Sequence, residues 1–204
     1  MGGFMKDAVK LFIITLISGL CLGAVYGMTK TTIEQQQIAA QLETYKVVYA
    51  EAANFQNNDA LTEQVDDFGD VLAESGLDLG NAGIESVLEA VDGSGNVIGH
   101  MLNVYSKDGY GGTIELSVGI TSEGEITGIG FLTLEETAGL GMKAKEPAFK
   151  DQFAGKNAEQ LVLTKSGASA DNEIDAISGA TITSTAVTNA VNAALYFAHN
   201  CISQ

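Results

Sequence analysis

The stretch IESVLEAVDGSGNVIGHMLNVYS, residues 84–106, holds two apolar segments separated by a glycine-rich turn. Residues 84–92 and 97–106 have the length and composition of strands, and GSGN between them is typical of a hairpin. A hairpin joins antiparallel neighbours in a sheet. Residues 112–121 and 125–134 repeat this pattern around the turn SEG. The sequence therefore predicts four strands in a mostly antiparallel sheet.

The chain after residue 134 supplies helices that should cover this sheet. Residues 146–155, EPAFKDQFAG, read as a short helix because Pro147 suits a helix start, and residues 161–165 read as a short strand. A final helix is expected from Thr181 to Asn200, since its apolar residues recur at helical spacing. The residues expected to pack on the sheet are Ile182, Ala186, Ala190, Ala193, Ala194 and Phe197. The predicted fold class is α+β, an antiparallel sheet covered by helices.

The N-terminal residues are of a different kind. Residues 11–28, LFIITLISGLCLGAVYGM, contain no charged side chain, and a helix of this length just crosses a bilayer core of roughly 30 Å. Lys6 and Lys10 precede them, so the positive-inside rule predicts a cytoplasmic tail of residues 1–10 and a main domain outside. A cleaved signal peptide and a buried soluble helix are the alternatives. We favour one uncleaved transmembrane helix, because the bulky residues that end the segment suit a cleavage site poorly.

Residues 29–83 are expected to connect this anchor to the outer domain, residues 84–204. Residues 29–55 read as a helix that continues the anchor. Residues 54–82 are acidic and interrupted by glycine, so we expect loop with short helices there. The expected order is a tail, a transmembrane anchor, a helical and acidic connecting region, and one globular domain.

Charge and residue spacing exclude several functional classes. The net charge is −16, with ten lysines and no arginine, so the clustered cations that nucleic-acid binding needs are absent. Any bound anion must be held by lysine, hydroxyls, backbone N–H groups or a helix N-terminus. Neither the histidines, His100 and His199, nor the cysteines, Cys21 and Cys201, have the spacing of a metal site or disulfide framework.

The segment Leu134–Lys143, LEETAGLGMK, is the first candidate ligand site. It follows a predicted strand and enters the loop Gly139-Leu140-Gly141, whose glycines let backbone approach a flat ligand closely. Leu140 is placed to press on a ring face, with the carboxylate of Glu136 before it and Lys143 after it. A plain strand-to-helix turn is the simpler alternative, because Gly-x-Gly alone is a weak signal.

The segment Asp175–Ser184, DAISGATITS, is the second candidate. Ser178 or Thr181 can cap the final helix by accepting hydrogen bonds from backbone N–H groups, which explains one hydroxyl. Capping explains neither Asp175 nor the Gly-Ala pair that leaves Thr181 sterically open. An anionic group on Thr181 would lie at the helix N-terminus, where the dipole and the free N–H groups favour negative charge. Capping and anion attachment are compatible, and we expect both.

Asp175-Ala-Ile-Ser178-Gly179-Ala180-Thr181 resembles the flavinylation motif of the FMN-binding domain family, Asp-x-x-Ser/Thr-Gly-Ala-Thr. The resemblance implies that Thr181 carries FMN through a phosphoester to its hydroxyl. A flavin transferase would install the group from FAD, and Asp175, Ser178, Gly179 and Ala180 would complete the recognition sequence. The resemblance covers residues 84–200.

The first candidate segment shares this resemblance. Glu136-Thr137-Ala138-Gly139-Leu140-Gly141 is similar to the family's Glu-Thr-Pro-Gly-Leu-Gly, with Ala138 in place of proline, and Tyr110-Gly111-Gly112 resembles the family's entry into a core strand. The cofactor contacts that the resemblance implies here come from Glu136, Thr137, Gly139, Leu140, Gly141 and Lys143. Lys143 is expected to stabilise a reduced, anionic flavin through its charge.

The whole layout is similar to that of the G-subunit family of the Rnf electron-transport complex. The resemblance implies a membrane-anchored electron-transfer flavoprotein, a redox subunit of a ferredoxin:NAD ion-translocating complex in the bacterial inner (cytoplasmic) membrane. Its partners would be the other Rnf subunits, the flavin transferase and the lipid bilayer, and it would have no catalytic side chain or substrate turnover of its own. The alternatives are the C subunit of a sodium-pumping NADH:quinone reductase, which is usually longer, a non-redox FMN-binding module, and a purely structural anchor.

Overall fold

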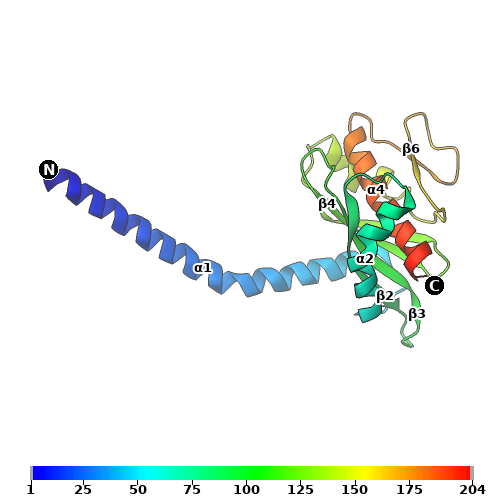
Figure 1. Cartoon of the computed structure of the whole chain (residues 1–204), viewed down its shortest axis with the longest axis horizontal. Coiled ribbons are helices and arrows are strands. Elements are labelled where there is room, and N and C mark those ends of the chain that lie inside the picture. Colours follow the sequence, from blue (N-terminus) through cyan, green and yellow to red (C-terminus); the bar gives the residue numbers. More distant parts are fainter. Residues whose placement is uncertain (1, 203–204) are drawn as a thin grey trace. The chain divides into compact units, whose positions relative to one another are not determined.

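The computed structural model of this chain describes residues 2–202, and for residues 2–5, 24, 25 and 27–40 it describes the backbone alone. The chain divides into two compact units, Met1–Leu42 and Glu43–Gln204. Helix α1 runs from Gly2 to Val48 (Figure 1). Its residues up to Leu42 belong to unit 1, and its residues from Glu43 onward belong to unit 2. The predicted continuous helix is confirmed up to Val48. It was wrong for residues 49–55, which form a turn and the start of a strand.

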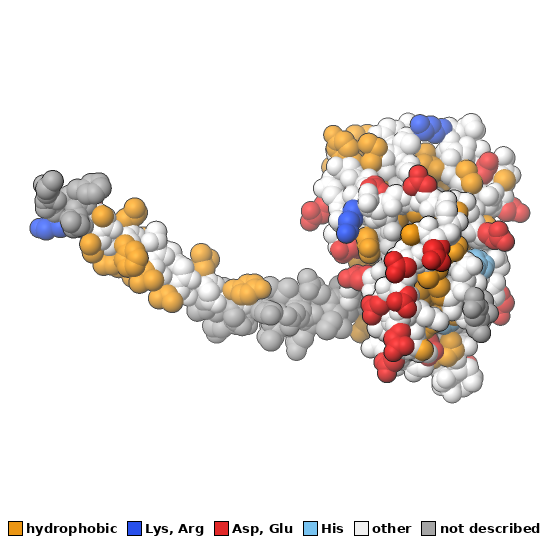
Figure 2. All heavy atoms as spheres, viewed as in Figure 1, with side chains coloured by type: hydrophobic (Ala, Val, Ile, Leu, Met, Phe, Trp, Pro, Cys, Tyr) orange, Lys and Arg blue, Asp and Glu red, His pale blue; other side chains and the backbone are white. Residues whose placement is uncertain are grey.

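Apolar side chains are exposed along the described part of unit 1 (Figure 2). Leu11, Phe12 and Leu20, for example, are all exposed. Among the residues that the structure describes, no helix is long and apolar enough to cross a membrane. The side chains of residues 24, 25, 27 and 28, within the predicted anchor, lie outside the described set. The transmembrane assignment stays a prediction.

Unit 2 is built on a five-stranded sheet in which every neighbouring pair is antiparallel. The strands follow chain order: β1 (Asn54–Asn57), β2 (Ala82–Val91), β3 (Val97–Ser106), β4 (Ile114–Thr121) and β5 (Ile126–Thr133). The four predicted strands are confirmed. Strand β1 escaped prediction because it is short and polar, and its pairing with β2, from Asn54 opposite Val91, is a tertiary effect.

Helix α2 (Asp59–Ser75) occupies most of residues 54–82, where loop with short helices was predicted. Its start is fixed by Asn58, whose Oδ1 accepts a hydrogen bond from Ala60 N at 3.0 Å, and it ends at Gly76 with φ of 71°. Its buried face includes Phe68, whose ring meets that of Phe197 at 5.4 Å between centroids. Helical structure was thus predicted here but as short pieces, and the break expected at glycine was wrong, because the mid-helix Gly69 is tolerated when one face is buried.

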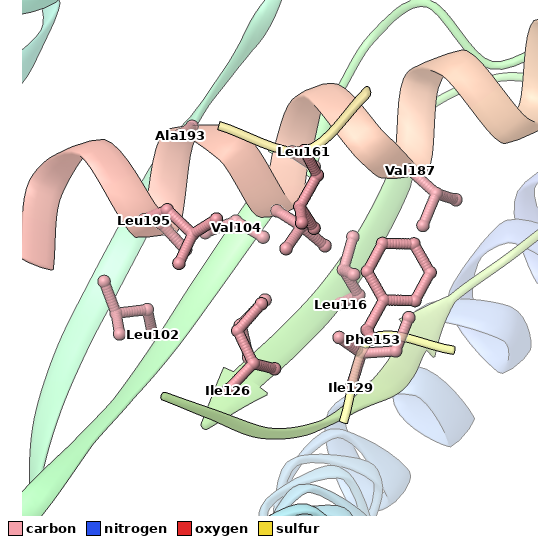
Figure 3. Close-up of a cluster of buried hydrophobic side chains, with 14 of the residues drawn as sticks. Leu102, Val104, Leu116, Ile126, Ile129, Phe153, Leu161, Val187, Ala193 and Leu195 are labelled. Atoms are coloured by element: carbon pink, nitrogen blue, oxygen red, sulfur yellow. The ribbon is translucent and has the colours of Figure 1, made fainter. Parts of the chain in front are cut away.

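Helix α4 (Thr181–Phe197) covers one face of the sheet and makes the main core (Figure 3). Leu102 and Val104 of β3 and Leu116 of β4 meet Val187 and Leu195 of α4 there. Five of the six helix positions predicted to pack on the sheet are buried: Ala186, Ala190, Ala193, Ala194 and Phe197. The sixth prediction was wrong, because Ile182 lies in the first turn and is 55% exposed.

The opposite face of the sheet is covered by the last residues of α1. Tyr45 and Val48 are buried against it, and a β-carbon built on Gly130 would lie 2.7 Å from Val48 Cγ2, so the helix needs a glycine there. Asn103 Nδ2 donates to Tyr45 Oη at 2.5 Å, and Asn103 Oδ1 accepts from Ser117 Oγ at 2.8 Å. These buried hydrogen bonds fix where the helix meets the sheet.

The remaining short elements lie between β5 and α4. They are η1 (Gly141–Lys145), α3 (Pro147–Lys150), and a parallel pair of strands made by β6 (Val162–Thr164) and β7 (Glu173–Asp175). After α4 the chain forms one π-helical turn, η2 (Ala198–Ile202). The helix predicted over residues 146–155 is shorter than expected, and β7 was not predicted. Gln152 holds the backbone of β7, since its Oε1 accepts from Asp175 N at 2.7 Å.

Candidate functional site

The turn that leads into α4 is held by a buried serine of the first helical turn. Ser184 Oγ accepts a hydrogen bond from Ile177 N at 3.0 Å and donates to Ala180 O at 2.9 Å. The N-cap residue is Ala180, and no side chain caps the helix. The predicted cap was therefore wrong, because Ser178 is exposed and the internal hydroxyl of Ser184 closes the turn from within the helix.

The loop after β5 is a tight turn followed by the 3₁₀ helix η1. Leu140 N donates to Thr137 O at 3.1 Å, and Met142 N donates to the same carbonyl at 3.2 Å. Gly139 takes a left-handed conformation with φ of 76°, which favours glycine. The predicted turn is confirmed, and it presents Leu140 as an exposed side chain at its end.

These two segments, distant in sequence, meet at one cleft of about 510 Å³. A β-carbon built on Gly179 would lie 3.3 Å from Leu140 Cδ2, so the leucine of the loop reaches the glycine of the turn. We call this the Thr181 cleft. It is lined by Tyr110, Glu136, Thr137, Leu140, Gly141, Gly179, Ala180, Thr181, Ile182 and Thr183.

Seven of the residues predicted to bind a cofactor come together in the cleft: Thr181, Gly179, Ala180, Glu136, Thr137, Leu140 and Gly141. Asp175, Ser178, Gly139 and Lys143 belong to the same two segments but are not among its lining residues. Asp175 ends strand β7, and Ser178 is exposed. The two groups of residues are thus candidates for different roles.

Glu136 is the charged side chain of the cleft. Its Oε1 accepts a hydrogen bond from Tyr110 N at 2.8 Å, which ties the loop after β5 to the turn before β4. Its Oε2 is buried and has no hydrogen-bond partner in the part of the chain that the structure describes. A β-carbon built on Gly141 would lie 2.6 Å from this oxygen and 2.6 Å from Thr183 Oγ1, so only glycine fits there.

Three exposed apolar side chains share the cleft. Tyr110 is 70% exposed, Ile182 is 55% exposed and Leu140 is 44% exposed. A contiguous group of exposed apolar side chains beside polar atoms is typical of a binding site. By contrast, acidic side chains are spread over the visible face of unit 2 (Figure 2).

Sequence reasoning missed three lining residues, Tyr110, Ile182 and Thr183. Tyr110 lies in the glycine-rich stretch GYGG, which gave a signal for a special turn but none for its distance to residue 181. Ile182 matched the helical core pattern, and only its place in the first turn separates it from the core. Thr183 is 1% exposed, as a core residue would be.

Comparison with known proteins decides the family of this chain. Residues 109–196 match the FMN-binding domain model. The chain is 32% identical to the G subunit of the Na(+)-translocating ferredoxin:NAD(+) oxidoreductase complex of Acetobacterium woodii, over 96% of this chain and 91% of the relative. The chain belongs to the G-subunit family of ion-translocating oxidoreductase complexes. A second member of this family, from the proton-translocating ferredoxin:NAD(+) oxidoreductase complex of Clostridium ljungdahlii, is also 32% identical, over 93% of this chain and 92% of the relative.

A solved structure also matches this member of the G-subunit family. The C subunit of the Na(+)-translocating NADH-quinone reductase from Parabacteroides distasonis is 26% identical, with a TM-score of 0.45 over 55% of this chain and 61% of that one. All ten residues that line the Thr181 cleft fall within residues 109–196, the part matched by the FMN-binding domain. The FMN-binding part of this member of the G-subunit family thus contains the cleft.

Proposed function

We propose that this chain is the flavoprotein subunit of an ion-translocating ferredoxin:NAD oxidoreductase complex, and that it holds FMN in the Thr181 cleft through a phosphoester to the Thr181 hydroxyl. Family membership supports the complex, and the FMN-binding domain supports the cofactor. The observation that carries the attachment site is that Thr181 lines the cleft as a partly buried residue at the start of α4.

The size and surface of the cleft support the binding of this cofactor. Its volume of about 510 Å³ lies within the range of roughly 300 to 1,000 Å³ of small-molecule sites. The exposed side chains of Leu140, Ile182 and Tyr110 offer apolar contact to a flat ring system. The first turn of α4 has no side-chain cap, so its N–H groups and helix dipole favour a phosphate on Thr181.

Neighbouring hydroxyls fit the attachment less well than Thr181. Thr183 and Ser184 are buried, at 1% and 0% exposure, and Ser184 is already engaged in both directions. Ser178 and Thr185 are exposed but do not line the cleft. Thr181 alone among these five combines access from outside with a place at the cleft.

The residues outside the cleft fit a role in recognition rather than in ring contact. Ser178 is exposed three residues before Thr181, where a flavin transferase can reach it. Asp175 precedes it at the end of β7. We assign Asp175 and Ser178 to recognition, while Lys143, in the neighbouring η1, would act on a bound anionic flavin through its charge alone.

When bound, FMN supplies the electron-transfer chemistry, and the protein supplies position and electrostatics. Leu140 and Ile182 would keep water from the ring, and the covalent link would prevent loss of the cofactor outside the cell. The helix α1 would anchor the domain in the bilayer through residues 11–28, with the other subunits of the complex as partners. Exposed apolar side chains along the described part of α1 support this.

The attachment is tested by co-expressing the full chain with a flavin transferase and examining the denatured band for flavin fluorescence. We expect a fluorescent band in the wild type, none in Thr181→Ala, and full fluorescence in Thr185→Ala, the exposed hydroxyl four residues further along α4. A wild-type band without fluorescence would rule out covalent attachment of the flavin. A fluorescent Thr181→Ala band would show that the flavin is attached to another residue.

A redox titration of the loaded protein separates electron transfer from storage. We expect reversible reduction and reoxidation of the bound flavin. A flavin that is not reversibly reduced in the working range of the complex would favour the non-redox binding module instead.

A further inference from the structure

We propose that Tyr110 is a cofactor-contacting residue, which covers the flavin ring in the Thr181 cleft and is positioned there by a hydrogen bond from its backbone to Glu136. This inference rests on the proposed function and adds to it the residue that shields the ring. Neither the flavinylation motif nor the Glu-Thr-x-Gly-Leu-Gly loop contains Tyr110.

The side chain of Tyr110 is available for a ligand. It is 70% exposed and lines the cleft together with Leu140 and Ile182. An isolated exposed aromatic residue needs no explanation, but three exposed apolar side chains around one cleft form a shared binding surface. A tyrosine offers a flat face to a flat ring and loses little conformational entropy when it does so.

The backbone of Tyr110, in contrast, is held firmly. Its N–H donates to Glu136 Oε1 at 2.8 Å. A β-carbon on Gly109 would lie 3.1 Å from the same carboxylate oxygen and 2.9 Å from Ile114 Cγ1, and one on Gly111 would overlap the carbonyl oxygen of Glu135. The two glycines therefore let this turn pack directly on the loop after β5. An exposed ring on a fixed backbone is preorganised for contact with a ligand.

Holding the backbone N–H group of Tyr110 with the carboxylate of Glu136 has an energetic cost, which indicates that the position of Tyr110 matters. Its second oxygen, Oε2, is buried without a partner among the described residues. Gly141 leaves the space that this oxygen occupies. A buried unsatisfied carboxylate oxygen is unfavourable, and functional sites are where such costs are tolerated. Glu136 is thus a positioning residue that acts through Tyr110.

Two measurable properties follow for the bound flavin. Contact with Tyr110 shields one part of the ring from solvent, so collisional quenchers should reach it poorly. The negative face of the tyrosine ring also disfavours added electron density on a stacked partner, so Tyr110 should lower the midpoint potential.

The test uses the full chain, co-expressed with the flavin transferase and folded, and measures quenching of flavin fluorescence by iodide. We expect the Stern–Volmer constant to rise several-fold in Tyr110→Ala and to stay near the wild-type value in Tyr110→Phe, which keeps the flat ring. Val162→Ala, an exposed apolar residue outside the cleft, is the matched control and should leave the constant unchanged. The midpoint potential should rise in Tyr110→Ala.

The positioning role of Glu136 is tested in the same assay. Glu136→Gln keeps an oxygen that accepts from Tyr110 N and should resemble the wild type in quenching, whereas Glu136→Ala should resemble Tyr110→Ala. Thermal unfolding checks that each variant is folded, and Tyr110→Ser replaces Tyr110→Ala if that variant does not fold.

Covalent loading on the denaturing gel separates the two proposals. A wild-type band without flavin defeats the proposed function. A loaded Tyr110→Ala protein with wild-type quenching and potential overturns the role of Tyr110, and a loaded Glu136→Ala protein with wild-type quenching overturns its positioning by Glu136.

Discussion

Leu140 lies against Gly179, with its Cδ2 only 3.3 Å from the place that a β-carbon on Gly179 would occupy. This contact joins the loop after β5 to the turn before α4, the two segments that enclose the Thr181 cleft. Gly179 also has φ of 79°. Its lack of a side chain therefore allows both the left-handed backbone conformation and the close approach of Leu140.

Gly179→Ala should therefore destabilise the fold for two reasons. The left-handed conformation costs about 1 to 2 kcal/mol for a residue with a β-carbon, and the new methyl group presses on Leu140. Gly155→Ala is the matched control, since Gly155 has φ of 78° and open space around its β-carbon position. Chemical denaturation should show a greater loss of unfolding free energy for Gly179→Ala than for Gly155→Ala. Flavin loading should fall in Gly179→Ala alone. Equal losses with normal loading would mean that the Leu140 contact is unimportant.

Ser184→Ala should destabilise the turn that carries Thr181. The variant leaves the N–H of Ile177 without its acceptor in a buried site, a cost of about 1 to 3 kcal/mol. Thr185→Ala, the exposed neighbour, should change the free energy of unfolding by no more than about 0.5 kcal/mol. Urea denaturation of the full chain measures both. A Ser184→Ala protein as stable as the control would show that another group satisfies Ile177.

Local patterns were enough to predict four of the five strands of the sheet. Strands β2 to β5 alternate or run apolar over eight to ten residues, and two hairpin turns set their order. Strand β1 and the full length of helix α2 were not predicted because both depend on contacts with residues distant in sequence. Strand β1 is held by pairing with β2, and α2, besides its local cap at Asn58, is held by burial of Phe68 against Phe197. Tertiary contacts of this kind leave little trace in a short, acidic sequence.

The two segments that form the cleft were predicted, but the contacts that bring them together with Tyr110 were not. The glycines around Leu140 and the small residues before Thr181 marked each segment. Nothing in the spacing required Glu136 to reach back to Tyr110, because that bond crosses from the loop after β5 to the turn before β4. The helical pattern also assigned Ile182 to the core, since periodicity cannot tell a first-turn residue from one further along the helix.

Glu89 should make the stability of unit 2 depend on pH. Its carboxylate accepts from Asn58 Nδ2 at 2.6 Å and from Gln56 Nε2 at 3.0 Å. The bond from Asn58 is the largest cause of a pKa of Glu89 below its ordinary value of 4.5; burial opposes it, and the bond from Gln56 and the nearby His100 lower the pKa further. A lowered pKa in the folded state means that the stabilisation is complete above pH 4.5 and is lost as the pH falls through the folded value.

Glu89→Gln should accordingly be less stable than the wild type at pH 7, and the difference should shrink below pH 4.5. Glu63→Gln, an exposed carboxylate on α2, is the control and should show no such trend. Thermal unfolding across this pH range measures the effect. A difference that stays constant with pH would show that the charge of Glu89 contributes nothing to its bonds with β1 and α2.

The turn at residues 137–140 offers a stabilising substitution. Leu140 N bonds to Thr137 O, Gly139 has φ of 76°, and no non-glycine residue of the described chain has a positive φ, which together define a type II turn. Ala138 takes the second position, where proline is favoured, and its amide makes no backbone hydrogen bond in the described loop.

Ala138→Pro should therefore raise the free energy of unfolding by about 0.4 to 1 kcal/mol, because proline restricts the unfolded chain while fitting the folded turn. Ala138→Gly should act in the opposite direction, since it adds freedom to the unfolded chain. Denaturation curves with unchanged slopes would establish both effects. Because the turn presents Leu140 to Gly179, the proline variant should also load flavin at least as well as the wild type. Destabilisation by proline would instead mean that the backbone before Gly139 departs from a type II turn, and with it the rigidity on which the contact between Leu140 and Gly179 depends.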